Sequence, residues 1–443
     1  MAEDWRWQSA AELGRGIGAG RIDPVDLAGA LFDAIRAHPD SSRIYARLTE
    51  DRALAEARAA ARRARLGQRL GPLDGVPVSW KDLFDTAGTA TEAGSALLRG
   101  RVPDRDADVV ATASAEGLVG LGKTHMSELA FSGLGLNPIT ATPPCVNDEE
   151  AVPGGSSSGA AASVAFGLAP AAIGSDTGGS VRIPAAWNDL VGLKTTWGRL
   201  PAGGVVPLAA RFDTIGPLCR SVEDAALLLA ALEGRKRAPD LGGASLRGAR
   251  LMVLENGLKA ARDAPRAGFD SALGRLMDAG AEVSRATFDI VDEALGMSAI
   301  LFTTEAYAIW RDAIEADPDA MYPQIRDRFR LGGQVSGVDY VTAWRRLDAI
   351  REEFHRLTAG FDAVVLPTAA NMPPNLDRLM TDQDYYVTEN LLTLSNTRIG
   401  NLMGSAALTL PTGLPSTGIM FLGAPMGEER LLRLGAAAER VLA

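Results

Sequence analysis

Hydrophobic and polar positions follow two different patterns along this chain. Residues 8–66 predict helices. Within them, Ser9 followed by Glu12 is a capping pattern, and Asp23-Pro24 is a typical start of a further helix. In the rest of the chain, short apolar runs bounded by glycines predict strands instead. These runs lie at residues 75–80, 118–121, 171–173, 251–254, 363–366, 407–410 and 419–422.

Helical patterns separate these strands, for example at residues 221–232 and 337–357. Strands that alternate with helices predict an α/β fold with a large sheet covered by helices on both faces. Residues 233–248 are rich in charge, glycine and proline, but apolar strands continue on both sides of them. We therefore expect one domain over residues 1–443. Its expected parts are a helical N-terminal part (1–70), a core (71–232) and a C-terminal part (249–443).

Charge and composition exclude several classes of protein. The chain has 443 residues, with 45 Lys and Arg against 55 Asp and Glu, so its net charge is −10. Because an acidic surface repels phosphate backbones, we expect no direct binding of nucleic acid. Two cysteines are too few for a disulfide framework, and three scattered histidines cannot form a His-rich metal site. Chemistry that depends on imidazole is therefore poorly provided for.

Two long uncharged runs, residues 151–175 and 399–427, exceed the length that spans a bilayer. Both runs contain proline and several glycines, which favours buried structure over a spanning helix. The N-terminus carries charges where a signal peptide would be apolar. We therefore expect a cytoplasmic protein that does not associate with a membrane.

Two loops rich in glycine and serine, residues 153–159 and 176–184, are the most unusual segments of the chain. Each adjoins an apolar or alanine-rich segment, so both loops are expected to be buried. Glycines in a buried loop let the backbone approach a ligand closely. Residues 154–161 lack the Gly-Lys-Ser/Thr ending of a phosphate-binding loop, which disfavours nucleotide binding.

The first loop also matches the G-x-S-x-G nucleophile elbow, with Ser157 as the nucleophile. That motif requires a preceding strand and a downstream histidine. Residues 147–153 do not predict a strand, and the only downstream histidine, His355, lies in a charged helical stretch. The elbow interpretation is therefore disfavoured.

The second loop predicts a turn that binds an oxyanion. Residues 177–180 follow a predicted strand, and their successive N–H groups can hold a negatively charged oxygen. Ser180, at the end of this turn, is the candidate nucleophile. Since histidine is scarce, a lysine is the natural base, and Lys81 ends an apolar strand candidate. The alternative interpretation of Lys81 is a lysine that reaches the surface from a strand end.

Three segments of the chain resemble the amidase signature family: GVPVSWKDLFD with Lys81, PGGSSSGAAASVA with Ser156 and GSDTGGSVRIPAA with Ser180. The similarity extends over nearly the whole chain, and the motifs occur in the order and at the spacing of that family. The resemblance implies a single α/β domain with a large mixed, twisted sheet and a Ser–Ser–Lys triad that acts on amides.

Carried over by position, the resemblance implies that Ser180 is the nucleophile, Ser156 the relay serine with a cis peptide bond, and Lys81 the general base. It also implies an oxyanion hole made by the N–H groups of Thr177, Gly178, Gly179 and Ser180. To be neutral near pH 7, Lys81 must have a pKa lowered by about three units from ~10.4, which burial can achieve. Water then hydrolyses an acyl-enzyme at Ser180, and neither a metal nor a cofactor is expected.

Several further residues are candidates for supporting roles. Asp176 and Arg182 flank the nucleophile loop and are expected to pair and brace it. Ser157 matches a family position that hydrogen-bonds the relay serine, although packing would also explain a small residue there. Met126 falls where the family lines its acyl pocket, with a core methionine as the alternative. His125 stands where the family commonly has asparagine, and we expect a structural role for it.

The expected function is hydrolysis of a small amide, with release of ammonia or an amine. The alternative is the A-type component of a glutamine-dependent glutamyl-tRNA amidotransferase, which requires a partner protein. Arg328 would then anchor the glutamine carboxylate, unless it lies on the surface of a helix. A binding module without activity is disfavoured because all three triad positions are present. The sequence leaves open the acyl group, a preference for esters and the formation of a homodimer.

Overall fold

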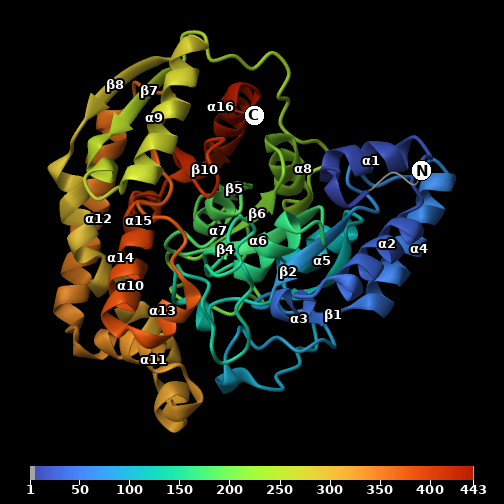
Figure 1. The fold of residues 1–443 in the computed structure, drawn as a ribbon, viewed down its shortest axis with the longest axis horizontal. Coiled ribbons are helices and arrows are strands. Elements are labelled where there is room, and N and C mark those ends of the chain that lie inside the picture. The colour runs from blue at the N-terminus through green and yellow to red at the C-terminus, as the bar shows by residue number, and fades with distance from the viewer. Residues whose placement is uncertain (1–4, 443) are drawn as a thin grey trace.

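One mixed β-sheet runs through the computed structural model, which describes residues 5–442 (Figure 1). Its eleven strands lie in the order β1-β3-β2-β4-β6-β5-β10-β11-β9-β7-β8. Their bounds are β1 Tyr45–Leu48, β2 Pro77–Lys81, β3 Val119–Thr124, β4 Ala171–Asp176, β5 Val191–Lys194, β6 Thr214–Cys219, β7 Arg250–Leu254, β8 Glu282–Ala286, β9 Ala363–Pro367, β10 Ala406–Pro411 and β11 Gly418–Gly423.

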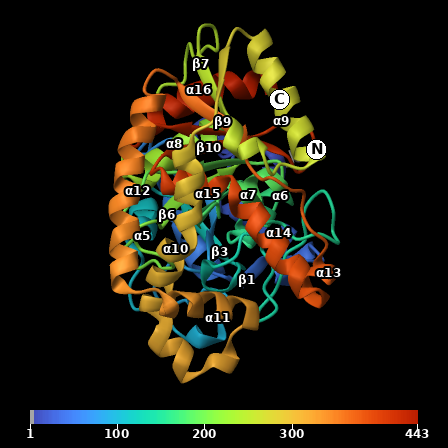
Figure 2. The same cartoon turned by 90° about the vertical axis from the view of Figure 1, so that its left-hand side faces the viewer.

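Sixteen α-helices within the described residues surround the sheet. The N-terminal helices lie beside one end of the sheet, whereas α10, α12 and α14 lie beside the other end (Figures 1 and 2). The bounds are α1 Ala10–Gly18, α2 Pro24–Ala37, α3 Ser41–Ile44, α4 Glu50–Arg65, α5 Asp108–Ala115, α6 Ser158–Ala165, α7 Arg182–Trp187, α8 Val222–Leu232, α9 Asp263–Asp278, α10 Asp289–Ala316, α11 Pro323–Arg330, α12 Gly337–Thr358, α13 Leu376–Thr381, α14 Gln383–Ser395, α15 Thr397–Leu402 and α16 Glu428–Leu442.

Helices cover both faces of the sheet, as the alternation of strands and helices predicts. On β10, Leu408 packs directly against Gly435 of α16. The next residue, Thr409, faces Gly192 of β5, and a Cβ at Gly192 would lie 2.7 Å from Cβ of Ala185 on α7. Because successive side chains of a strand point to opposite faces, α16 and α7 cover opposite faces of the sheet. The predicted α/β fold is confirmed.

All seven strands predicted from apolar runs are present, as β2, β3, β4, β7, β9, β10 and β11. The prediction of helices throughout residues 8–66 is wrong at β1, which pairs antiparallel with β3 at the edge of the sheet. The two predicted helix starts in this part are confirmed. Ser9 and Glu12 form a capping box at α1, and Asp23 caps α2 with Pro24 in its first turn.

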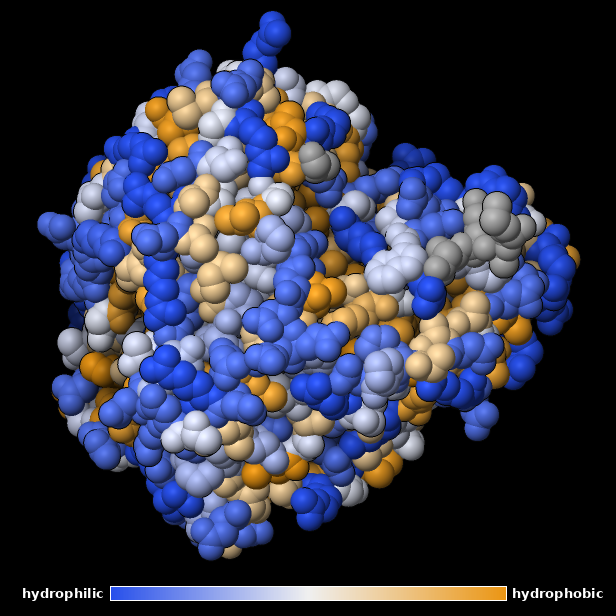
Figure 3. Space-filling model, viewed as in Figure 1, coloured by the Kyte–Doolittle hydropathy of each residue, from blue (hydrophilic) through white to orange (hydrophobic). Residues whose placement is uncertain are grey.

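The segment 233–248 connects two parts of the same sheet. The chain leaves β6 and α8 before this segment and enters β7 after it, and β7 pairs with β9 of the same sheet. The uncharged runs 151–175 and 399–427 form short helices, strands and loops. Among residues 5–442, no helix is both long and apolar enough to span a membrane. Hydrophilic residues cover most of the face seen in Figure 3.

Candidate active site

The candidate site lies where two neighbouring parallel strands end. β2 and β4 pair in parallel, so their carboxyl ends meet at the same edge of the sheet. Lys81 is the last residue of β2, and Asp176 is the last residue of β4. Both side chains are completely buried. The alternative of a surface lysine at position 81 is therefore wrong.

Lys81 contacts two serine hydroxyls from different loops. Its Nζ donates hydrogen bonds to Oγ of Ser156 at 2.6 Å and to Oγ of Ser175 at 2.8 Å. The peptide bond between Gly155 and Ser156 is cis, as the family resemblance implies. The tertiary structure thus brings Lys81 and Ser156 together, although they are 75 positions apart in the sequence.

The electrostatic surroundings of Lys81 favour its neutral form more than water does. Burial lowers the pKa of Lys81 to about 7, against the attraction of the carboxylates of Asp176 and Asp213. Asp213 is held by the hydroxyl of Thr177, which donates to Oδ1 at 2.6 Å. A substantial fraction of Lys81 is therefore able to accept a proton at neutral pH.

Ser180 is buried and borders a cavity. Within residues 5–442 its hydroxyl makes no hydrogen bond to another protein group, and neither do the backbone N–H groups of Thr177, Gly178 and Ser180. The N–H group of Gly179 instead donates to Oδ1 of Asp176 at 2.9 Å. The four-residue oxyanion hole therefore needs a correction, because only three of the implied donors are free to bind an oxyanion.

Gly179 is required by the geometry of this loop. Its φ is 140°, and a Cβ atom would overlap with the side chain of Thr397. An L-amino acid with a side chain rarely adopts such a backbone conformation. The glycine therefore allows α15 to pack directly against the nucleophile loop.

A buried ion pair braces the same loop. Asp176 accepts hydrogen bonds from Nε and Nη2 of Arg182 at 3.0 and 2.9 Å, and from the N–H groups of Gly179 and Val181. Burial alone would raise the pKa of Asp176, but the positive charge of Arg182 holds it well below its usual value. Asn401 joins the network by donating to Asp176 at 2.9 Å. The expected pairing of Asp176 with Arg182 is confirmed.

Ser157 connects the two loops rather than facing the cavity. Its hydroxyl donates to the carbonyl oxygen of Ser175 at 3.2 Å, and its N–H group donates to the carbonyl oxygen of Ser180, also at 3.2 Å. The residues before Ser157 form a loop, and His355 on α12 contacts the carbonyl oxygen of Met403 instead. The structure therefore contradicts the nucleophile elbow at Ser157.

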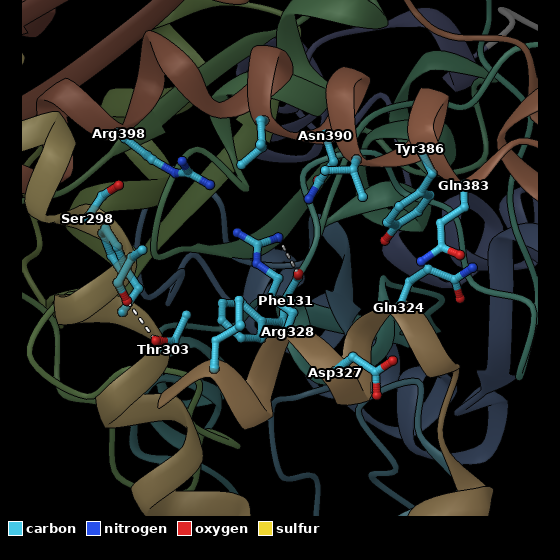
Figure 4. A pocket seen from close by; sticks show the side chains of 15 residues that line it. Phe131, Ser298, Thr303, Gln324, Asp327, Arg328, Gln383, Tyr386, Asn390 and Arg398 are labelled. Carbon is cyan, nitrogen blue, oxygen red and sulfur yellow. Dashed lines mark hydrogen bonds between the residues drawn. The ribbon is translucent and has the colours of Figure 1, made fainter. Parts of the chain in front are cut away.

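The cavity beside Ser180 has an inner and an outer part. The inner part, of about 30 Å³, is bordered by Thr177, Gly178 and Ser180. The outer part, of about 360 Å³, lies between α10, α11 and α14 (Figure 4). The two parts adjoin, since they share the lining residues Phe131, Phe302, Arg328 and Arg398.

The structure separates the remaining candidate residues into two groups. Arg328 lines both parts of the cavity, so its placement on the outer surface of a helix is wrong. Met126 is completely buried and does not line this cavity, which favours the core interpretation. His125 holds the first loop through its carbonyl oxygen, which accepts a hydrogen bond from the N–H group of Gly159 at 2.9 Å.

Sequence reasoning missed three residues of the site, namely Ser175, Arg398 and Asn401. Ser175 lies inside a recognised motif, and its neighbours drew the assignment. Arg398 directly precedes the uncharged run 399–427. A lone charge beside a long apolar segment is a signal that points to a buried ion, although it does not identify the partner.

Fold and site together define a hydrolase that acts on C–N bonds. A family model described as "Amidase" matches residues 26–432, and the chain belongs to this family of amidase-signature enzymes. It is 36% identical to 2-amino-5-chloromuconic acid deaminase of Comamonas testosteroni, over 98% of this chain and 97% of that protein. It is 33% identical to the A-type component of glutamyl-tRNA(Gln) amidotransferase from Anaeromyxobacter sp. (strain K), over 97% and 95%. A crystal structure of an amidase matches with a TM-score of 0.88 and 30% identity, over 98% of this chain and 100% of that one.

Proposed function

We propose that this protein hydrolyses a small amide through an acyl-enzyme at Ser180, with Ser156 as the relay and Lys81 as the general base. The observation that carries the proposal is the hydrogen bond of 2.6 Å between the buried Lys81 and Ser156. A lysine with a pKa near 7 can take up and return a proton in neutral solution. The free hydroxyl of Ser180 borders the cavity where an amide would bind.

In the acylation step, Oγ of Ser180 attacks the carbonyl carbon of the amide. Its proton passes through the hydroxyl of Ser156 to neutral Lys81, and the N–H groups of the nucleophile loop stabilise the oxyanion. The C–N bond then breaks as Lys81 returns the proton through Ser156 to the leaving nitrogen. Water attacks the resulting ester by the same route, which releases a carboxylic acid and restores Ser180. These steps use only side chains, backbone N–H groups and water.

A fluorophosphonate tests the nucleophile directly, because it labels activated serines irrespective of the natural substrate. We expect one adduct by intact mass in the wild type and none in Ser180→Ala. Ser132→Ala is the matched control, since Ser132 borders the same inner part of the cavity and should leave labelling intact. An adduct that persists in Ser180→Ala would contradict the assignment of the nucleophile.

The pH dependence of hydrolysis tests the role of Lys81. The base is active in its neutral form, so kcat/KM for an uncharged amide should rise with pH through an apparent pKa near 7 and then level off. Initial rates between pH 5 and 10 measure this profile. A profile that is flat over this range, or that rises only near pH 10, would exclude Lys81 as the base.

The A-type component of a glutamyl-tRNA amidotransferase is the second candidate function, favoured by the 33% identity to such a protein. In that case the chain would hydrolyse glutamine and would depend on a partner protein. Ammonia release by the isolated chain separates the two candidates. Hydrolysis of simple amides without a partner supports the first, whereas activity restricted to glutamine and a partner supports the second.

A further inference from the structure

Two arginines at the inner part of the cavity have no acidic partner within residues 5–442. Arg398 makes no hydrogen bond or ion pair with any described residue. Arg328 donates only to the carbonyl oxygen of Phe131, at 2.8 Å, and lies over the ring of the same residue. By contrast, the buried Arg182 and Arg199 are paired with carboxylates. The cavity therefore contains two positive charges that the protein itself does not neutralise.

The two guanidinium groups influence each other. Burial lowers the pKa of Arg398 to about 9, and the positive charge of Arg328 acts in the same direction. Burial also lowers the pKa of Arg328 to about 10. Both groups are charged at neutral pH, and a buried charge without a partner is unfavourable. An anion between them would remove this unfavourable contribution.

The position of the pair limits where that anion would lie. A Cβ atom at Gly178 would be 3.7 Å from Cγ of Arg398, so Arg398 packs against the nucleophile loop. Both arginines border the inner part of about 30 Å³ together with Ser180. Figure 4 shows both side chains directed into the space between the helices. An anionic group held there lies within a few bonds of a carbonyl carbon at Ser180.

The remaining lining is not acidic. Among the described residues that line the cavity, Asp327 is the only one with a carboxylate, and it is exposed and paired with Arg326 at 2.9 Å. No carboxylate of these lining residues therefore faces the inner part, where the ammonium group of an amino acid would need one. The lining favours an acid without an amino group near its carboxylate.

We infer that Arg328 and Arg398 bind a carboxylate of the substrate, and that the substrate is the monoamide of a short dicarboxylic acid. The inference rests on the proposed function for the cleavage of the amide. The two guanidinium groups present several N–H donors to the two carboxylate oxygens. They place the carboxylate at one end of the inner part and the amide carbon beside Ser180.

Matched pairs of amides test this inference. Malonamate, succinamate and glutaramate each have a neutral counterpart with a methyl group in place of the carboxylate: propionamide, butyramide and valeramide. We expect kcat/KM to be at least about 100-fold higher for the acid in one or more pairs, because hydrogen bonds between charged groups are strong. No preference in any pair, or a preference for glutamine over glutaramate, would overturn the proposed substrate class.

Variants locate the preference. Arg398→Met and Arg328→Met should each lower the ratio of acid to neutral kcat/KM by about 30-fold, and Arg398→Lys should retain part of it. Arg330→Gln is the control on the same helix, because Arg330 pairs with Glu315 and does not line the cavity. A ratio that falls equally in Arg330→Gln, or that stays unchanged in the two Met variants, would overturn the inference. Melting temperatures verify that the variants are folded.

A binding measurement separates this inference from the proposed function. Calorimetry with Ser180→Ala measures the affinity for succinamate and butyramide without turnover. Preferential binding of succinamate that is lost in Ser180→Ala/Arg398→Met supports the carboxylate site, even if the wild type hydrolyses neither amide and the proposed function fails. Equal affinity for both amides overturns the carboxylate site, even if the wild type hydrolyses both and the proposed function holds.

Discussion

Replacing Lys81 by methionine is expected to lower kcat/KM for amide hydrolysis by about 10⁴-fold, the upper range for loss of a general acid–base group. Methionine fills a similar volume without a proton acceptor, so Ser156 would lose its partner at 2.6 Å. Ser156→Ala should also lose far more than tenfold, because it interrupts the same relay. Ammonia release under conditions where each variant is folded measures both effects.

Lys123→Met is the matched control for this experiment. Lys123 is also buried, on the neighbouring strand β3, and burial lowers its pKa to about 8. It donates to Thr91 at 2.8 Å and pairs with Asp82, away from the serine hydroxyls. We expect Lys123→Met to affect stability more than turnover. Comparable losses of turnover in Lys81→Met and Lys123→Met would mean that both act through the fold, and the role of Lys81 as base would be wrong.

Replacing Arg182 by methionine is expected to destabilise the protein by about 3–5 kcal/mol, because it leaves Asp176 as a buried charge without its ionic partner. The carboxylate would keep its bonds to the N–H groups of Gly179 and Val181, so part of the loop would remain anchored. Thermal or urea unfolding at pH 7 measures the change. Turnover should fall as well, since the nucleophile loop depends on this pair.

Two comparisons test the physical reason for that loss. Asp176→Asn/Arg182→Met removes both charges and should be less destabilising than Arg182→Met, because no unpaired charge remains. Arg346→Met disrupts the exposed pair with Glu293 and should change stability by about 1 kcal/mol or less. If the double variant is as unstable as the sum of two independent losses, Asp176 and Arg182 are not energetically coupled.

Strands that escaped prediction share an identifiable physical reason. β5 and β6 lie in the middle of the sheet, but β6 contains Gly216 and Pro217, which are unusual in a central strand. β1 and β8 are the two edge strands, and their partly exposed residues do not form an apolar run. The pairing with β3 or β7, rather than local preference, makes these segments strands.

The sequence by itself determined the strands with apolar runs, the helix caps and the motif positions of Lys81, Ser156 and Ser180, because these features depend on neighbours within a few residues. Only the tertiary structure decided which N–H groups remain free for an oxyanion, since Asp176 takes that of Gly179. It also placed Arg328 and Arg398 beside Ser180. These arginines come from separate helices far along the chain, and no local pattern records a contact that forms only when distant segments pack together.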